Sequence, residues 1–327
     1  MKSLTYILTL TILISIFPKS LWAIGPKAVG EGITENDNER ICIAGNCDSD
    51  LLTFVTTSSL FTERWDSLPQ TLFWRKIIKT SPDSGFLNIS STRHILSKWS
   101  TKEWCRLTGE QRERLLDSLQ KSVNLGENEQ LLFTTGKKDF YTIEPILSSI
   151  DKAVKIFENE NTDPFYAQAI LLIESPGRLQ KSTVGAYGSF QLMRSVAIRM
   201  GLTVNKRMDE RKDFSRSAWA AAKLLRTICI PETKYMLERQ GISYNEHDLW
   251  FRLLVLHVYH AGAGNVAPIL DKICPSIGNQ ELIMQIWQTS HGAFRNSSQN
   301  YSQLALASLL ELNELVVSKA VFRENSK

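Results

Sequence analysis

The segments AQAILLIE (residues 167–174) and STVGAYGSFQLM (residues 182–193) decide the fold of this chain. The first segment predicts a buried helix that ends near Glu174, because Pro176 disfavours helical geometry in the residue before it. A carboxyl group at the end of an apolar helix is partly desolvated, which raises its pKa and lets it act as an acid at neutral pH. The Gly-Ala-Tyr-Gly turn of the second segment would bring bare backbone and its N–H groups close to that acid.

These two segments together favour acid catalysis on a bulky polar substrate. A single Glu after an apolar run is more often a solvated helix end, because charged groups are rarely fully buried. Cleavage of a glycosidic bond, however, needs a protonated carboxyl group at the leaving oxygen. The order and spacing of the acid and the glycine turn therefore carry more information than either feature does alone.

Length and composition describe an ordinary globular protein. The chain has 327 residues, of which 43% are hydrophobic and 22% are charged, and its formal net charge is +4. This length suffices for one large or two modest domains. The charge balance and the lack of a long basic stripe argue against nucleic acid as a partner, whereas a mildly basic surface is compatible with an anionic polymer.

The N-terminus has the pattern of a secretory signal. Lys2 precedes an apolar stretch over residues 4–17, a Pro-Lys-Ser break follows, and Ala23 offers a small residue for cleavage. The stretch is shorter than the roughly 20 apolar residues that a spanning helix needs. We therefore expect residues 1–23 to be a signal peptide and the protein to be periplasmic or cell-envelope associated; an uncleaved anchor is the alternative.

Export makes disulfides possible, and the chain has five cysteines. Cys42 and Cys47 could close a short local loop. Cys229 and Cys274 lie beside prolines near the ends of predicted helices and could join them. Cys105 would then remain unpaired, buried as a small hydrophobic residue. The cysteine spacings do not form a pair of zinc knuckles.

The order of apolar periodicity and polar breaks predicts a mainly α protein, since no alternating run is persuasive as a strand. Tryptophans in the first half could stack on sugar rings, but aromatic side chains are more often part of a core. The predicted parts are a signal peptide (1–23), a loosely ordered leader (24–50), a helical N-terminal region (51–139), a main catalytic domain (140–295) and a C-terminal helix (296–327).

Four blocks of the sequence, in order, resemble the soluble lytic transglycosylase (SLT) domain of the lysozyme-like superfamily, over roughly residues 145–290. The blocks are Glu174-Ser175, the segment 182–193, the helix with its preceding acidic turn at 209–222, and the segment YHAGAGNV at 259–266. The third block is most similar to that of the membrane-bound D-type murein transglycosylases. The resemblance implies a goose-type or SLT-type helical catalytic domain, here with an additional helical N-terminal region.

The chain departs from the family pattern at three places. His260 stands where the family usually has Asn, and Arg194 stands where a proline commonly follows the Met. The aromatic residue usual after Glu-Ser is replaced within Pro176-Gly177-Arg178, and no LysM-type wall-binding repeat follows the catalytic region. A histidine can change its charge between pH 5 and 8. We therefore expect His260 to add a pH dependence to activity.

The resemblance implies peptidoglycan glycan strands as substrate, cut between N-acetylmuramic acid and N-acetylglucosamine without hydrolysis. Glu174 would be the general acid and then the base, and the substrate's own acetamido group would replace a second carboxylate. Tyr259 would hydrogen-bond and orient Glu174. The other residues that the resemblance places against substrate are Ser182, Gly185, Ala186, Tyr187, Gly188, Gln191, Met193, His260, Ala261 and Gly262.

Two alternatives to a lytic transglycosylase stay open. One is a goose-type hydrolase with water as the nucleophile, and the other is a non-catalytic peptidoglycan-binding scaffold. No cofactor is expected, and His257 with His260 is a poor metal pair because no matched ligand set accompanies it. The acidic residues at 209–213 are better explained as a capped, solvated turn than as a second catalytic pair. We expect a monomer with possible cell-envelope protein partners.

Overall fold

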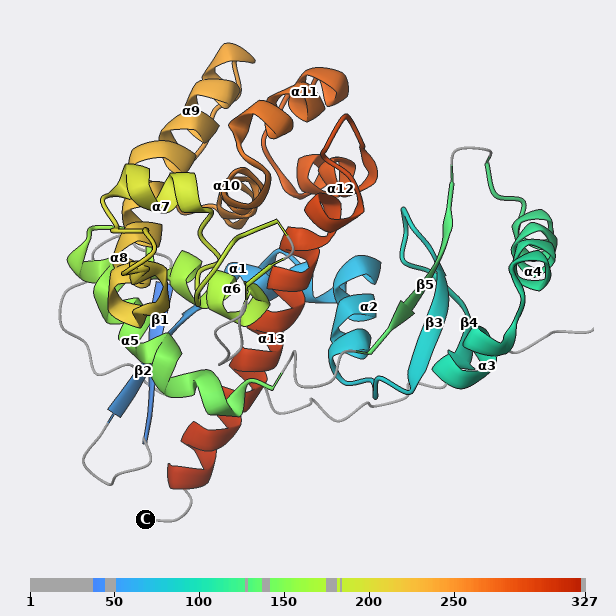
Figure 1. Cartoon of the computed structure of the whole chain (residues 1–327), viewed down its shortest axis with the longest axis horizontal. Helices are drawn as coiled ribbons and strands as arrows, with labels where there is room; N and C mark the ends of the chain where they lie inside the picture. The colour runs from blue at the N-terminus through green and yellow to red at the C-terminus, as the bar shows by residue number, and fades with distance from the viewer. Residues whose placement is uncertain are drawn as a thin grey trace, which may run out of the picture. The chain divides into compact units, whose positions relative to one another are not determined.

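Helices make up most of the architecture, as the sequence predicts (Figure 1). The computed structural model describes residues 38–44, 51–126, 129–136, 142–174, 181–182 and 184–324. The predicted signal segment 1–23, most of the leader 24–50 and the segment at 175–178 lie outside the described residues. In the described part of the chain, no helix combines the length and the apolar character that crossing a membrane requires.

The second half of the chain consists mainly of helices. They are α5 (Leu147–Asn159), α6 (Pro164–Glu174), α7 (Arg194–Met200), α8 (Phe214–Leu224), a π-helical turn (Leu225–Cys229), α9 (Ile230–Arg239), α10 (Leu249–Ala261), α11 (Ala263–Ile273), α12 (Gln280–Gln288) and α13 (Asn296–Glu324). Short 3-10 turns precede α5 (Glu144–Ile146) and α8 (Glu210–Lys212).

Helix α6 is the central element and carries the predicted acid at its end. Asp163 begins it by accepting a hydrogen bond from the backbone N–H of Phe165 at 2.9 Å, and Pro164 fits the first turn because its missing N–H is not needed there. Every residue from 165 to 173 is buried. The buried Arg252 of α10 holds the same Asp163 at 2.8 Å. The predicted helix start is thereby confirmed.

Helices α10 and α13 pack against α6 and against each other. All residues of α10 from 249 to 258 are buried. Within the C-terminal helix, residues 301–310 are buried without exception. The reason is that α13 contacts α6 and α10 as well as the N-terminal helix α2 (Pro69–Ile78), so that little of its middle portion faces water.

A two-stranded hairpin covers the start of α6. Strands β1 (Asn38–Ala44) and β2 (Leu51–Thr57) are antiparallel, with Ile41 opposite Phe54. On the other edge of β2, the side chain of Gln168 accepts from the N–H of Val55 at 2.7 Å and donates to its carbonyl oxygen at 2.6 Å. Gln168, a residue of α6, therefore provides hydrogen-bond partners for the backbone of Val55 at the free edge of β2. These two bonds connect α6 to the hairpin.

The N-terminal region is not purely helical, so that part of the prediction is wrong. A three-stranded antiparallel sheet of order β4-β3-β5 lies within it, formed by β3 (Ser84–Ile89), β4 (Ile95–Ser100) and β5 (Leu131–Thr135). Its helices are α1 (Ser59–Thr62), α2, α3 (Thr101–Arg106) and α4 (Gly109–Ser122), with a 3-10 turn at Trp65–Ser67. The central strand is buried at five consecutive positions, and a strand buried on both faces shows no alternation in its sequence.

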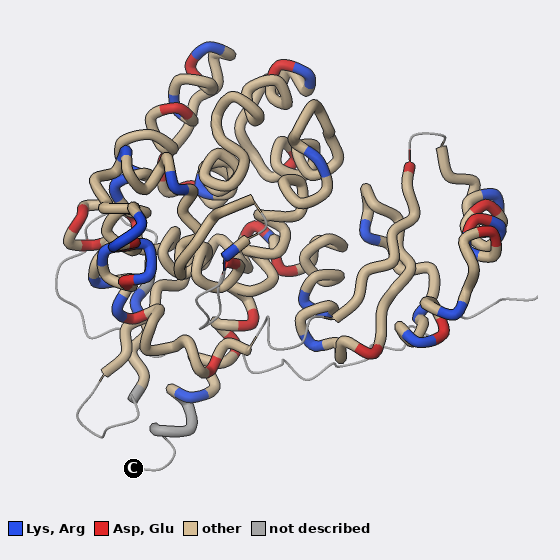
Figure 2. Tube along the Cα trace, in the orientation of Figure 1, with Lys and Arg blue, Asp and Glu red and all other residues tan. Residues whose placement is uncertain are grey.

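Side chains of the N-terminal region hold α13. The indole N–H of Trp74 donates to Gln303 at 3.0 Å, Arg75 pairs with Glu311 at 2.7 Å, and the buried Arg93 donates to Asn300. Trp65 and Trp74 are buried, in agreement with their interpretation as core residues. Figure 2 shows lysines and arginines interspersed with acidic residues on outer helices such as α4 and α9.

The predicted link between Cys229 and Cys274 is absent. Both thiols are free, and Cys229 is buried whereas Cys274 is exposed. Cys42 and Cys105 are free and exposed, so Cys105 is not the buried residue that its interpretation required. Cys47, the proposed partner of Cys42, lies outside the described residues.

Candidate active site

Glu174 lies where the apolar helix α6 ends, and its environment makes it a weak acid. Burial raises the pKa of its carboxyl group to about 7, and contact with the hydroxyl of Tyr301 acts in the opposite direction. Near pH 7 the group is therefore present in both the protonated and the ionised form, which suits a residue that must donate and then accept a proton. The sequence predicted this residue and the physical cause of its raised pKa.

Tyr259, at the end of α10, is close to Glu174 but does not bond to it. Its hydroxyl donates to the carbonyl oxygen of Phe190 at 2.7 Å, which differs from the predicted bond to the acid. Burial first and then the charge of Glu174 raise the pKa of Tyr259 well above its ordinary value. Tyr259 thus joins α10 to the glycine-containing loop, and the charge of Glu174 acts on its hydroxyl.

Tyr301, near the start of α13, is the site residue that the sequence reasoning missed. It is 4% exposed, and its hydroxyl faces Glu174 closely enough to lower the pKa of that carboxyl group. This contact does not count as a formed hydrogen bond, and within the described structure the buried hydroxyl has no hydrogen-bond partner. In the sequence, Tyr301 is a single tyrosine near the start of an apolar helix, and this context is only weak evidence for a role in the site.

The loop 181–193 folds back on itself beside the acid. Ser182 closes its first turn, because its N–H donates to the carbonyl oxygen of Ala186 and its hydroxyl accepts from the N–H of Ala186, both at 2.9 Å. Tyr187 forms bridges to Lys181 and Leu192. Gln191 donates to the carbonyl oxygen of Gly188 at 2.9 Å. These bonds within the loop give it a defined shape.

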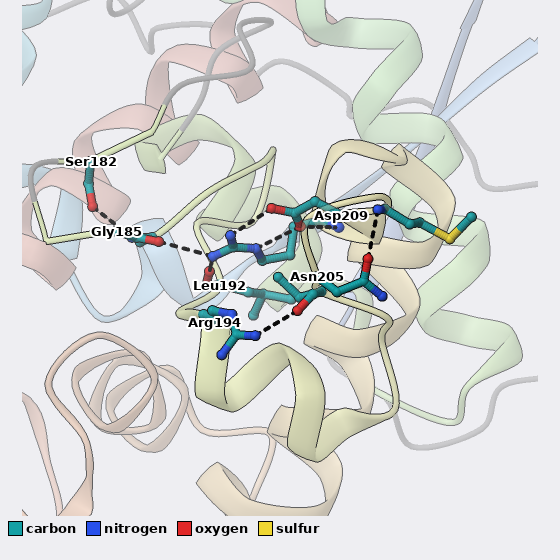
Figure 3. Close-up of polar contacts among 10 residues, drawn as sticks. Ser182, Gly185, Leu192, Arg194, Asn205 and Asp209 are labelled. Atoms are coloured by element: carbon teal, nitrogen blue, oxygen red, sulfur yellow. Dashed lines mark hydrogen bonds and ion pairs between the residues drawn. The ribbon is translucent and has the colours of Figure 1, made fainter.

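Arg211 supports this loop through hydrogen bonds to its backbone, and Figure 3 labels the partners Gly185, Leu192 and Asp209. Its buried guanidinium donates to the carbonyl oxygens of Gly185 and Leu192, each at 3.0 Å, and pairs with Asp209 at 2.7 Å. The hydrogen bond with Arg211 is the main cause that lowers the pKa of Asp209. Asp209 also accepts from the N–H of Arg211, so the acidic turn is capped as predicted, and its carboxylate serves the loop.

Arg194, which departs from the family pattern, extends this support. Its guanidinium donates to the carbonyl oxygen of Val204 at 2.9 Å, joining the first residue of α7 to the following turn (Figure 3). Met193 caps the same helix and is 40% exposed. The side chain of Met193 is therefore available on the surface of the loop, as a cleft-lining role requires.

Gly188 occupies a position that admits no side chain. Its φ is +84°, and a Cβ atom there would lie 2.0 Å from the carbonyl oxygen of Arg211. Gly188→Ala is expected to lower the free energy of unfolding by about 2 kcal/mol or more, because backbone strain and a clash add together. Gly185→Ala is the matched control, since its φ is +91° but a Cβ there meets nothing within 4 Å. Equal losses in urea denaturation would contradict the role of the close approach.

His260 lies on the surface at the end of α10, with Ala261 and Gly262 after it. Its ring stacks on that of Tyr301, with centroids 4.3 Å apart and planes at 24°. Desolvation lowers the pKa of His260 to about 4. The residue is exposed, and water around it favours the charged imidazole, which opposes this shift. His260 is neutral at pH 7, and the geometry does not support the expected pH dependence through its own charge.

His257 takes part in a buried hydrogen bond. Its ring is fully buried, lies 2.7 Å from the hydroxyl of Ser302, and has its pKa lowered to about 3 by burial. The described residues contain no group of three or more His, Cys, Asp or Glu side chains that could hold a metal ion. The bond between His257 and Ser302 joins α10 to α13. The hydroxyl of Ser302 also accepts from the indole N–H of Trp287 at 2.7 Å.

Fold and site together define a lysozyme-like helical domain with a half-buried carboxyl group, that of Glu174, near a glycine-containing loop. Residues 153–271 match the family model of the transglycosylase SLT domain, so this part of the chain is an SLT domain. The match includes Glu174, the loop and Tyr259, whereas Tyr301 lies beyond its end. Lytic transglycosylase activity on peptidoglycan is the activity of this domain family. No curated protein matches the chain.

Proposed function

We propose that this protein is a peptidoglycan lytic transglycosylase that cleaves the β-1,4 bond between N-acetylmuramic acid and N-acetylglucosamine and leaves 1,6-anhydromuramoyl ends. The observation that carries the proposal is the environment of Glu174. Its pKa is raised to about 7 by burial, and the one described side chain that lowers it is that of Tyr301, a neutral phenol. A lone carboxyl group with such a pKa fits a reaction that uses one residue first as acid and then as base.

The chemistry follows from this single carboxyl group. Protonated Glu174 donates its proton to the glycosidic oxygen, and that C–O bond breaks. The substrate's acetamido oxygen stabilises the positive charge at the anomeric carbon, so a second carboxylate is not needed. The Glu174 carboxylate then takes the proton from the muramoyl 6-hydroxyl, whose oxygen bonds to the anomeric carbon. Atoms balance without water, and Glu174 ends protonated, ready for another turnover.

The loop 182–193 provides the binding surface in this proposal. Ser182, Gly185, Ala186, Tyr187 and Gly188 present backbone groups and small side chains beside the acid, where the acetylated sugar is bound. Arg211 keeps this surface in place through the carbonyl oxygens of Gly185 and Leu192. A rigid loop lowers the cost of ordering a flexible glycan on binding. We further propose that the protein is exported, since peptidoglycan lies outside the cytoplasm.

The product distinguishes this reaction from hydrolysis by a goose-type lysozyme. With the 6-hydroxyl as nucleophile, muropeptides released in oxygen-18 water are expected to carry anhydromuramic ends and no label. Mass spectrometry of digests of purified peptidoglycan measures both. Label at the new reducing ends would assign the protein to the hydrolases instead. Binding of glycan strands without any cleavage would support the scaffold alternative.

The two tyrosines are expected to differ in what they contribute. Tyr301→Phe removes the hydroxyl that lowers the pKa of Glu174, so that pKa and the corresponding limb of the pH–rate profile should move upward. Tyr259→Phe leaves the Phe190 carbonyl without its donor and should lower the free energy of unfolding by about 1 kcal/mol, with reduced turnover from a loosened loop. Rate profiles and urea denaturation of both variants test this. Identical profiles for the two variants would contradict the assignment.

A further inference from the structure

His260 contacts the site in a way that its family-typical counterpart, an asparagine, could not. Its ring is stacked nearly parallel on the ring of Tyr301, with centroids 4.3 Å apart. Offset stacking of this kind is a favourable arrangement for two ring systems. Among the described residues, His260 makes no side-chain hydrogen bond, so the stack is the ring contact that holds it. The ring of the exposed His260 therefore covers one face of the buried Tyr301 ring.

Tyr301 depends on packing for its position. Its buried hydroxyl lacks a formed hydrogen bond to any described residue, so no such bond fixes where the oxygen lies. The phenol oxygen lies on the long axis of the ring, and a flip of the ring about that axis leaves it in place. A tilt of the ring moves it. A contact on the ring face therefore limits how far the hydroxyl can move away from Glu174.

The backbone around Tyr301 is already held by other groups. Asn300 accepts from the buried Arg93, and Gln303 accepts from the indole of Trp74 at 3.0 Å. Ser302 bonds to His257 at 2.7 Å. These bonds fix the start of α13 but do not act on the Tyr301 ring, which lies in the hydrophobic core and is 4% exposed. The His260 stack is the contact in the described structure that restrains this tilt from the exposed side.

We propose that His260 is a positioning residue that holds the Tyr301 hydroxyl against the carboxyl group of Glu174 by stacking on the Tyr301 ring. The inference rests on the proposed function only in taking Glu174 as the acid. The positioning role of His260 does not require this histidine to change its charge, in contrast to the expectation from the sequence. The chemical requirement is a flat ring at position 260, which phenylalanine also meets and asparagine does not.

Because few groups act on Glu174, its pKa should depend directly on the stacking of His260 on Tyr301. Tyr301 comes from α13, Tyr259 and His260 come from α10, and the buried thiol of Cys229 comes from the π-helical turn and acts on both tyrosines. The thiol is neutral near pH 7, because burial raises its pKa to about 12. Only the Tyr301 contact lowers the pKa of Glu174. Losing that contact should raise the pKa of Glu174.

The test is a carbon-13 NMR titration of the Glu174 carboxyl group in the full folded chain, with Glu174→Gln used to assign the signal. His260→Ala and His260→Asn are expected to raise the pKa of Glu174 by up to roughly one unit, in the same direction as Tyr301→Phe. His260→Phe should keep the pKa of the unmodified protein. In the double variant His260→Ala with Tyr301→Phe, the pKa should equal that of Tyr301→Phe alone. His94→Ala, an exposed histidine between β3 and β4, is the control and should change nothing.

Three outcomes would overturn the proposal. An unchanged pKa in His260→Ala would mean that the stack has no influence on the acid. The same shift with and without the Tyr301 hydroxyl would mean that His260 acts directly. A downward shift would mean that His260 only shields Glu174 from water, because hydration of the carboxylate lowers the pKa. The titration needs no turnover, so it remains decisive even if the protein fails to cleave peptidoglycan and the proposed function is withdrawn.

Discussion

Glu174→Gln is expected to lower the rate of glycan cleavage by roughly 10²- to 10⁴-fold or more, with the fold intact. The amide keeps the shape of the carboxyl group but cannot deliver a proton to the leaving oxygen. It also cannot take the proton from the attacking hydroxyl, so both halves of the reaction are lost with one substitution. Anhydromuropeptide release from purified peptidoglycan, measured by mass spectrometry, gives the rate for each protein.

The matched control for this loss is Glu144→Gln, which changes an exposed glutamate paired weakly with Lys319 at 3.9 Å. It should cleave at the rate of the unmodified protein. Circular dichroism and thermal unfolding establish that both variants are folded. Wall-lytic activity retained by a folded Glu174→Gln protein would remove Glu174 from the mechanism and with it the proposed function.

The second large effect is on stability, and it has the opposite sign. The folded-state pKa of Glu174 is about 7, whereas an unperturbed glutamic acid has a value near 4.5. Between these values the unfolded chain loses this proton while the folded chain keeps it, so the free energy of unfolding falls as the pH rises. Above pH 7 the accumulated cost to the folded state is about 3 kcal/mol. Glu174→Gln removes this cost, because an amide does not ionise.

We therefore expect Glu174→Gln to be more stable than the unmodified protein at pH 7.5, by about 3 kcal/mol, and equally stable below pH 4.5. Urea denaturation of both proteins across this pH range measures the difference. A stability gain that did not vary with pH would indicate a packing effect of the amide instead. No gain at pH 7.5 would show that the carboxyl group of Glu174 is solvated in the folded protein.

The site acid and the local shape of its helix were predictable because they depend on neighbouring residues. Asp163 with Pro164 begins α6, and the apolar run to Glu174 makes its burial and raised pKa foreseeable. The sequence also predicted that Gly188 belongs to a glycine-containing turn. The partner of Tyr259 was not predictable: the choice between Glu174 and the Phe190 carbonyl oxygen depends on where a loop and a helix far apart in the sequence come to lie.

The N-terminal region shows where pattern reading fails. Strand β3 is buried on both faces, so its sequence lacks the alternation that identifies a half-exposed strand. The prediction of a disulfide between Cys229 and Cys274 was wrong for a related reason. That each cysteine lies near the end of a helix does not determine which helix ends lie close together. Each thiol's environment, buried for Cys229 and exposed for Cys274, is set by packing between helices.

The sequence by itself determined the mainly helical class, the helix that carries Glu174, the glycine turn and the desolvation of the acid, because each arises from interactions between residues close along the chain. Only the tertiary structure decided that Tyr301 faces Glu174, that His260 stacks on Tyr301, and that Arg211 supports the loop through hydrogen bonds to its backbone. These contacts join residues on separate elements. Their geometry follows from how the buried faces of α6, α10 and α13 pack together, and no spacing within one segment encodes that packing.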